Sequence, residues 1–272
     1  MNRNFAVIGV GNMAKSILAG MVASPCLSLA GLTLFDKNTS QYDSLSEKIV
    51  KLSTFARSIP EAVEASDCLL LSVKPQNFPE IMAEIKQAPS YASKLYISIA
   101  AGVESKYISD ALGGACVIRV LPNLPMTVGA GVSLICQNET ASSEDIAFVQ
   151  EVFRSAGSIV MIREKEMNRM IGVTSSSPAY VFQFVHAICQ GALAQGLTSD
   201  LLEVVCDVII GSAQLLKQCG ETPKALIDKV ASKGGTTEQA LRILNERGFD
   251  ETIREAMIAC TERADELGKS KS

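Results

Sequence analysis

Hydrophobic residues in the first part of the chain recur in short runs, separated by stretches with helical spacing or polar composition. Short apolar runs that do not alternate with polar residues are typical of strands covered on both faces by helices. Strand and helix patterns that alternate predict an α/β fold with a doubly wound parallel sheet. The predicted strands are residues 5–8, 32–35, 68–73, 95–99, 117–120, 132–136 and 158–162, and the clearest intervening helices are 60–66 and 142–155.

The pattern changes after about Arg163, where the short apolar runs stop and helical spacing takes over. We therefore predict two domains, a Rossmann-type dinucleotide-binding domain at residues 1–163 and an all-helical domain at residues 164–272. The predicted helices of the second domain are residues 178–194, 201–218, 223–230, 238–246 and 251–267.

One segment of the helical half, residues 170–199, contains no Asp, Glu, Lys or Arg. Its several serines and glutamines and the single histidine, His186, argue against a helix that faces lipid. A helix buried on most of its surface explains the composition better, either in a large core or in an obligate oligomer interface. We interpret His186 as a structural helix residue rather than a general acid or base, because no paired acid lies nearby in sequence.

Composition narrows the function classes. The 272 residues are 47% hydrophobic and 20% charged with a net charge of −4, which fits a globular protein and argues against a nucleic-acid groove or a membrane partner. The eight cysteines form no CxxC pair, so we predict no metal site and interpret them as reduced, mostly buried thiols of a cytoplasmic protein. The chain opens directly into a glycine loop, which leaves no room for a signal peptide.

The glycine loop follows the first predicted strand and opens a helix. Its first glycine permits a tight turn, the second lets a pyrophosphate approach the backbone, and the alanine allows close helix–strand packing. In that context the pattern GxGxxA predicts dinucleotide binding. The residues concerned are Gly9, Val10, Gly11, Asn12, Met13 and Ala14.

The second predicted strand ends at Asp36 and Lys37, which point to different cofactors. An acid at this distance from the glycine loop accepts a hydrogen bond from the ribose 2′-hydroxyl of NAD, whereas a lysine can neutralise the 2′-phosphate of NADP. These two residues leave the preference open. Later loops, at 74–76, 100–102 and 121–125, also follow predicted strands and favour one cofactor crevice at the carboxyl edge of the sheet.

The stretch VASKGGTTEQAL, residues 230–241, supports two interpretations. Thr236 and Gln239 have the spacing of a capping box, which predicts a capped connection between helices. The glycines also expose amide groups at a positive helix end, which suits a carboxylate or phosphate. A free Thr237 hydroxyl could donate to, or accept from, a group beside that anion.

The two halves together resemble the pyrroline-5-carboxylate reductase family over nearly the whole chain. The most specific motifs are the last two of the series, because other glycine-loop oxidoreductases lack them. The motifs are IGVGNMA at 8–14, SVKPQ at 72–76, AAGV at 100–103, RVLPNLP at 119–125, SPAYVF at 177–182 and SKGGTTEQAL at 232–241.

The resemblance implies reduction of 1-pyrroline-5-carboxylate to L-proline by hydride transfer, with NADP(H) preferred and NAD(H) also considered. It implies a helical domain that intertwines with that of a second subunit, an active site at the subunit interface, and larger rings such as a decamer of dimers. The implied cofactor residues are Ile8, Gly9, Val10, Gly11, Asn12, Met13, Asp36, Lys37, Ser72, Val73, Lys74, Pro75, Ala101, Gly102 and Asn123. The implied substrate residues are Glu164, Ser232, Gly235, Thr236 and Thr237, of which Thr237 approaches the ring nitrogen as the catalytic residue.

Some positions depart from the family pattern. Ser175 and Ser177 replace two glycines of GSGPAY, which adds side chains where we expect a tight backbone. Leu124 replaces a threonine and Lys233 a frequent proline, and none of these changes removes a reacting group.

Three alternative functions can be compared with this one, and the first of them is disfavoured. A β-hydroxyacid dehydrogenase would need a lysine and an asparagine on the long interdomain helix, and residues 171–196 contain neither. A reductase of another cyclic imine carboxylate would use the same anchoring groups. A non-enzymatic dinucleotide-binding regulator of the same fold is supported only by the two serines.

Overall fold

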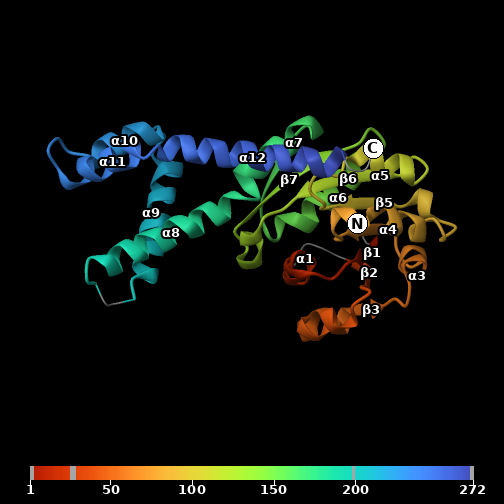
Figure 1. Cartoon of the computed structure of the whole chain (residues 1–272). Coiled ribbons are helices and arrows are strands. Elements are labelled where there is room, and N and C mark those ends of the chain that lie inside the picture. Colours follow the sequence, from red (N-terminus) through yellow and green to blue (C-terminus); the bar gives the residue numbers. More distant parts are fainter. Residues whose placement is uncertain (1–2, 25–28, 198–199, 270–272) are drawn as a thin grey trace. The chain divides into compact units, whose positions relative to one another are not determined.

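The computed structural model describes residues 3–24, 29–197 and 200–269, so Cys26 lies outside the described residues. The chain divides into two compact units, which are described separately below. The first unit contains everything up to Ser176 together with the chain from Ala259 onward, and the second is Ser177–Ile258. The first unit holds the sheet, and the second is helical (Figure 1).

The first unit is built on one eight-stranded sheet in the order β3-β2-β1-β4-β5-β6-β7-β8, in which only the β6–β7 pair is antiparallel. This confirms the predicted doubly wound fold. The strands are β1 Arg3–Ile8, β2 Leu29–Phe35, β3 Ser53–Phe55, β4 Cys68–Leu71, β5 Leu95–Ser98, β6 Cys116–Leu121, β7 Gly131–Gln137 and β8 Gly157–Met161. Its helices are α1 Asn12–Ala23, α2 Glu47–Leu52, α3 Ile59–Glu64, α4 Phe78–Ile85, α5 Ser105–Ala111, α6 Ser143–Arg154 and α7 Glu164–Thr174, with short 3-10 helices at Thr39–Ser44, Pro75–Asn77, Tyr91–Ser93 and Leu124–Val128.

Each face of the sheet buries its own apolar cluster, because successive side chains of a strand point to opposite faces. Phe5 and Val7 of β1 pack in a cluster with residues of α1 and α6. Ala6 and Ile8 of the same strand pack in a second cluster with residues of α3, α4 and α5. The unbroken apolar strand at 5–8 is thus explained by helices on both faces.

The strand order reverses beside β1, which pairs with the following strand β2 on one side and with β4 on the other. All three strands run parallel, so their carboxyl ends lie at the same edge of the sheet. Such a switch point leaves a crevice in which α/β proteins bind ligands. The glycine loop after β1 and the loop that begins at Ser72 after β4 meet at this edge.

The second unit has very little core of its own. Its helices are α8 Ser177–Ala194, α9 Leu202–Gln218, α10 Pro223–Val230 and α11 Thr236–Glu246, and α12 Phe249–Lys269 leads back into the first unit. Of the described residues in this unit, only Val205 is buried, with 8% of its surface exposed. Large apolar side chains such as Phe182 and Val208 are exposed instead.

These observations correct the prediction for residues 170–199. The segment is not one helix, because α7 ends at Thr174 and α8 begins at Ser177, and no α8 residue is buried in this chain. The second unit therefore does not form a large core around α8, and an oligomer interface stays the prediction for this apolar segment. His186 is exposed on α8. Within the described ranges, no helix is both long and apolar enough to cross a bilayer.

The described cysteines are all free thiols, but the prediction that most of them are buried was wrong. Only Cys68 and Cys136 are buried, because they lie in strands covered on both sides, and the other described cysteines are partly exposed.

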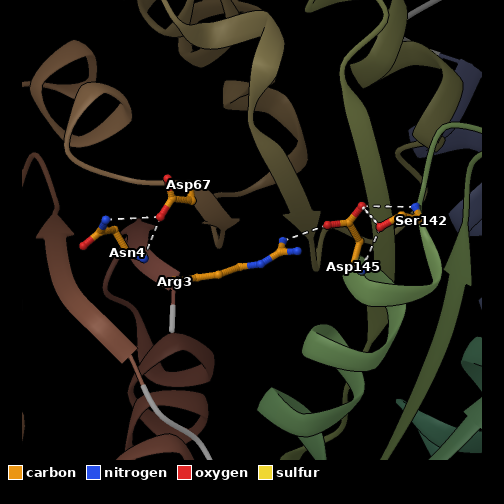
Figure 2. A network of polar contacts seen from close by, with 5 residues as sticks. All are labelled: Arg3, Asn4, Asp67, Ser142 and Asp145. Atoms are coloured by element: carbon orange, nitrogen blue, oxygen red, sulfur yellow. Dashed lines mark hydrogen bonds and ion pairs between the residues drawn. The ribbon is translucent and has the colours of Figure 1, made fainter. Parts of the chain in front are cut away.

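A polar network joins the start of β1 to neighbouring elements at the amino edge of the sheet. The Arg3 Nη1 atom donates to Asp145 Oδ1 at 2.7 Å, and Asp67 Oδ2 accepts from the Asn4 amide at 2.9 Å (Figure 2). Asp145 also forms a capping box with Ser142 at the start of α6. Burial would raise the pKa of Asp145, but hydrogen bonds from Ser142 and Arg3 outweigh it and lower that pKa below its usual value.

Replacing Arg3 by Met is expected to lower the free energy of unfolding by about 1–3 kcal/mol, because the partly buried Asp145 loses a charged partner. A carboxyl group with a lowered pKa in the folded state stabilises the fold above its unfolded pKa, near 3.8. The difference between variant and parent should therefore be full at neutral pH and shrink as pH falls through the lowered pKa. Urea unfolding at a fixed protein concentration, from about pH 7 down to about pH 3, measures this.

Lys51→Met is the matched control. Its ion pair with Glu47 is fully exposed, so its effect should stay below about 0.5 kcal/mol. An Arg3→Met effect no larger than that of the control, or one that does not change with pH, would contradict the role given to the Arg3–Asp145 pair.

Candidate active site

The first glycine of the loop after β1 is required by its backbone conformation and by its neighbours. Gly9 has φ +91°, and a Cβ placed on it would lie 2.5 Å from the Ser72 carbonyl oxygen. The Gly9 amide donates to the Phe35 carbonyl at 2.8 Å, which holds the loop to β2. The turn thus brings together the ends of β1, β2 and β4.

The second glycine, Gly11, faces open space and precedes backbone amides that have no acceptor within the helix. Gly11 is the N-cap of α1 with ordinary extended backbone, φ −75° and ψ −177°, and nothing lies within 4 Å of the position where its Cβ would be. The first backbone bond of α1 runs from the Lys15 amide to the Gly11 carbonyl, so the amides of residues 12–14 are left for another acceptor. Open space beside amides at a positive helix end fits the pyrophosphate of a dinucleotide.

A pocket of about 230 Å³ lies next to this loop and is lined largely by residues that the sequence predicted. One wall is the end of β2. There, Asp36 Oδ2 accepts from the Val10 amide at 2.6 Å and Oδ1 accepts from the Asn38 amide at 2.8 Å. A ribose hydroxyl bound here would share the carboxylate with the loop. The lining residues are Ile8, Gly9, Gly11, Phe35, Asp36, Lys37, Gln41, Ser72, Val73, Asn77, Glu80 and Ile81.

Lys37 has partners that sequence reasoning missed. Its Nζ atom lies 2.7 Å from Glu80 Oε1 and 3.3 Å from Glu84 Oε1, both on α4. These hydrogen bonds, first with Glu80 and then with Glu84, raise the pKa of Lys37 above its ordinary value. The only sequence signal was the spacing of two acids one helical turn apart, directly after the loop that ends β4.

The remaining predicted cofactor residues lie around the same edge of the sheet but do not line this pocket. Ser72 does line it, and its amide donates to the Ile8 carbonyl at 2.9 Å, which extends the pairing of β4 with β1. Lys74 is exposed and precedes the short 3-10 helix that starts at Pro75. Val10, Asn12, Met13, Ala101, Gly102 and Asn123 likewise fall outside the lining.

Gly102 is required by helix packing. Its φ is +74°, and a Cβ there would lie 2.7 Å from the Ala264 carbonyl oxygen and 3.2 Å from the Leu267 Cβ atom, both on the last turns of α12. The chain after Ala259 belongs to the same unit as the sheet, so α12 closes against the loop that follows β5.

Asn123 uses its side-chain amide to fix the end of β6. Its Nδ2 donates to the Thr174 carbonyl at 3.0 Å and its Oδ1 accepts from the Val132 amide at 2.8 Å. The side chain is buried and ties the last turn of α7 to the start of β7. Contact with a nicotinamide stays a prediction.

Glu164 forms the centre of a second polar cluster in the first unit. Its carboxylate accepts from Arg119 Nη1 at 2.7 Å, from the Ser105 amide at 2.7 Å and from the Ser105 hydroxyl. Burial would raise the pKa of Glu164, but bonds from Arg119 and Ser105 outweigh it and lower that pKa. Arg119 on β6 is only 2% exposed, and through Glu164 it is joined to α7 and to Ser105 at the start of α5. The cluster therefore has a structural role. Contact between Glu164 and a substrate stays a prediction.

The loop between α10 and α11 in the second unit needs both of its glycines. Gly234 has φ +73°, and Gly235 follows with its amide donating to the Ser232 carbonyl at 2.9 Å. A Cβ on Gly235 would lie 2.6 Å from the Ser232 hydroxyl and 2.9 Å from its carbonyl oxygen. The loop is therefore a tight turn that ends at the first residue of α11.

The capping prediction for this loop was wrong. Gly235 is the N-cap of α11 and makes no side-chain bond, while Thr236 is already helical. The side chain that does bind the loop backbone is that of Glu238, whose Oε2 accepts from the Gly234 amide at 2.8 Å. The physical reason is the left-handed turn at Gly234, which makes Gly235 the last extended residue.

Because Thr236 is not a cap, the helix start keeps free donors. The Gly235 amide is already paired, so the unpaired amides are those of residues 236–238. Within the described ranges the Thr237 hydroxyl makes no hydrogen bond, and its side chain is half-buried. The arrangement offers several amides and one hydroxyl to an anion that carries a second polar atom.

The serines at 175–177 fit their positions without strain. Ser175 has helical backbone, φ −85° and ψ −34°, and its hydroxyl donates to the Pro122 carbonyl at 3.3 Å. The described residues include no non-glycine residue with positive φ. A glycine is therefore not needed at Ser175 or Ser177 for backbone reasons.

Comparisons with known proteins agree with this geometry in both halves of the chain. Residues 164–267 match the family described as pyrroline-5-carboxylate reductase dimerisation, and residues 4–102 match NADP oxidoreductase coenzyme F420-dependent. Over 272 residues the chain is 34% identical to pyrroline-5-carboxylate reductase of Escherichia coli strain K12, covering 99% of this chain and 100% of the relative. The chain belongs to the pyrroline-5-carboxylate reductase family. It is also 33% identical to the Arabidopsis thaliana reductase over 265 residues, covering 97% and 95% of the two chains.

Solved structures of pyrroline-5-carboxylate reductases share the fold of the whole chain. The Plasmodium falciparum enzyme with NADP bound has a TM-score of 0.89 at 26% identity and covers 98% of both chains. The Streptococcus pyogenes enzyme has a TM-score of 0.88 at 26% identity and covers 97% of this chain and 99% of its own.

Proposed function

We propose that this protein reduces 1-pyrroline-5-carboxylate to L-proline by hydride transfer from NADPH, the last step of proline biosynthesis, with NADH as the secondary donor. The observation that carries the proposal is the relationship to pyrroline-5-carboxylate reductases from end to end of the chain. The NADP bound to the Plasmodium falciparum relative supports the choice of cofactor.

The reaction requires the protein mainly to orient the cofactor and the substrate. A protonated cyclic imine is already electrophilic at its C=N carbon, so orientation supplies much of the rate enhancement. When bound, NADPH supplies the hydride for that carbon, and the nitrogen keeps its proton in the product. No strong acid or base is required, which is consistent with an exposed His186 on α8.

The glycine loop is proposed to hold the cofactor. The amides at the start of α1 would donate hydrogen bonds to the pyrophosphate across the open face of Gly11. The pocket between Asp36 and Ser72 would receive the adenosine end, with Lys37 beside the 2′-phosphate. Both assignments rest on donors and space in one unit of the chain.

The substrate is proposed to bind at the start of α11. The unpaired amides of residues 236–238 would hold its carboxylate, since a helix N-terminus favours an anion. The Thr237 hydroxyl would then form a hydrogen bond with the ring nitrogen. Gly235 keeps the turn tight enough to present the amides and the hydroxyl together.

We propose that the working form is a homodimer built through the helical residues 164–272, beside a Rossmann domain at 1–163. The match of residues 164–267 to a dimerisation family and the exposed apolar side chains of α8 and α9 support this. A decamer of dimers is the larger assembly proposed. The free thiols of the described cysteines support a location in the cytoplasm.

Thr237→Ala is expected to lower kcat/KM for pyrroline-5-carboxylate by about 10- to 100-fold, the cost of losing a hydrogen bond to a charged group. The dissociation constant of NADPH should stay within about twofold, because Thr237 does not belong to the cofactor loop. Steady-state NADPH oxidation and fluorescence titration with NADPH measure the two quantities.

Thr237→Ser is the matched control, because it keeps the hydroxyl and should retain most of the activity. Wild-type kinetics in Thr237→Ala would remove the proposed role of this side chain. Absence of turnover in the parent protein, together with tight NADPH binding, would contradict the reductase assignment itself.

A further inference from the structure

The adenosine end of the cofactor pocket contains an unusual arrangement of charge. Lys37 is the only cation among the residues that line the pocket, and its ammonium group is already held by Glu80 at 2.7 Å and Glu84 at 3.3 Å. Both acids lie on α4, of which Glu80 and Ile81 line the pocket. The third acid is Asp36, whose carboxylate accepts a hydrogen bond from the Val10 amide of the glycine loop.

These groups affect the two nicotinamide cofactors differently. The 2′-phosphate of NADPH carries a charge of about −1.5 to −2 at neutral pH, whereas the ribose of NADH is a neutral diol. Three carboxylates against one ammonium group leave the neighbourhood negative, which opposes a second anion. To pair with the phosphate, Lys37 must also give up or share its bonds with Glu80 and Glu84.

We propose that Glu80 and Glu84 restrain the selection of NADPH over NADH by holding Lys37 and by repelling the 2′-phosphate. The inference rests on the proposed cofactor site and adds two specificity-determining residues on α4 to it. Since the diol needs no cation, the two acids have little effect on NADH. The protein therefore keeps NADH as a usable second donor while its lysine still favours NADPH.

The test is the ratio of the dissociation constants of NADH and NADPH, measured by fluorescence titration without imine substrate. In the double variant Glu80→Gln/Glu84→Gln this ratio should rise by about five- to tenfold, through tighter NADPH binding and nearly unchanged NADH binding. Added salt should reduce the difference, because these groups are exposed. An unchanged or lower ratio overturns the proposal.

Two further variants separate the mechanism from a general charge effect. Glu139→Gln/Glu144→Gln removes the same charge from exposed positions outside the pocket, and its ratio should match the parent. In a Lys37→Met background, the rise caused by the α4 substitutions should fall to less than about half. A rise of the same size without Lys37, or in the control variant, shows that the acids do not act by holding this lysine.

Cofactor binding is measured without pyrroline-5-carboxylate, so this test is independent of turnover. A protein that binds the cofactors as expected but does not reduce the imine would contradict the proposed reaction and leave the role of Glu80 and Glu84 standing.

Discussion

Phe182→Asp on α8 is expected to dissociate the proposed dimer and to unfold much of the region 177–258. In the single chain Phe182 is 56% exposed, and Val205 is the only buried residue among those described in this unit. A region with so little internal core depends on another surface to cover its apolar side chains. A twofold interface would receive the charge twice, so the dissociation constant should rise by at least about 1,000-fold.

Sedimentation velocity and far-ultraviolet circular dichroism measure the assembly and the helix content of this variant, and NADPH oxidation measures its activity. We expect a monomer with reduced helix content and activity lowered by more than about 100-fold, because the loop at 232–237 lies in the affected unit. Leu52→Asp is the matched control, since Leu52 is also 56% exposed but lies on α2 of the first unit. An intact, active dimer in Phe182→Asp would contradict an interface on this face of α8.

The two glycines of the nucleotide loop are expected to respond differently to the same substitution. Gly9→Ala forces a side chain into positive φ and places its Cβ 2.5 Å from the Ser72 carbonyl oxygen, so it should cost about 3 kcal/mol or more of stability. Gly11→Ala meets neither problem, because its φ is −75° and its Cβ would face open space. Its melting temperature without cofactor should therefore stay close to that of the parent.

NADPH binding separates the roles of the two positions. The methyl group of Gly11→Ala occupies the space through which the pyrophosphate is proposed to approach the amides of α1, so NADPH affinity should fall by about 100-fold. Gly9→Ala should lose both stability and binding. Calorimetric melting and fluorescence titration measure these outcomes. Tight NADPH binding by Gly11→Ala would contradict the proposed pyrophosphate site.

Local sequence signals located the cofactor loop because each of them lies within a few residues. The strand at 5–8, the glycines at 9 and 11 and the following helix each have a short-range physical cause, and the structure confirms all three. The edge strand β3, Ser53–Phe55, was not predicted, because three residues at the margin of a sheet carry no recognisable period. The start of α11 was predicted at residue 238 but lies at Thr236, two residues earlier, because the left-handed turn at Gly234 determines it.

The chemical environment of the site residues depended on longer separations. Lys37 and Glu80 meet across 43 positions because β2 and α4 border the same switch point, and Arg119 meets Glu164 across 45 positions because β6 lies under α5 and α7. From the sequence alone, Lys37 was expected to be an unpaired cation and Glu164 an unpaired carboxylate. In the fold, Lys37 is paired with Glu80 and Glu84, and Glu164 forms a structural ion pair with Arg119.

The sequence by itself determined seven of the eight described strands, the glycine loop and the family, because periodicity, turn chemistry and motif order are local properties of the chain. Only the tertiary structure decided that the serines at 175–177 are free of strain, that Thr236 is not a cap, and that Lys37 is held by two acids. The apolar surface of α8 was visible in the sequence, but its exposure appeared only when the chain was folded. Pairing and burial are set by contacts between distant segments, and those contacts exist only once the sheet has formed.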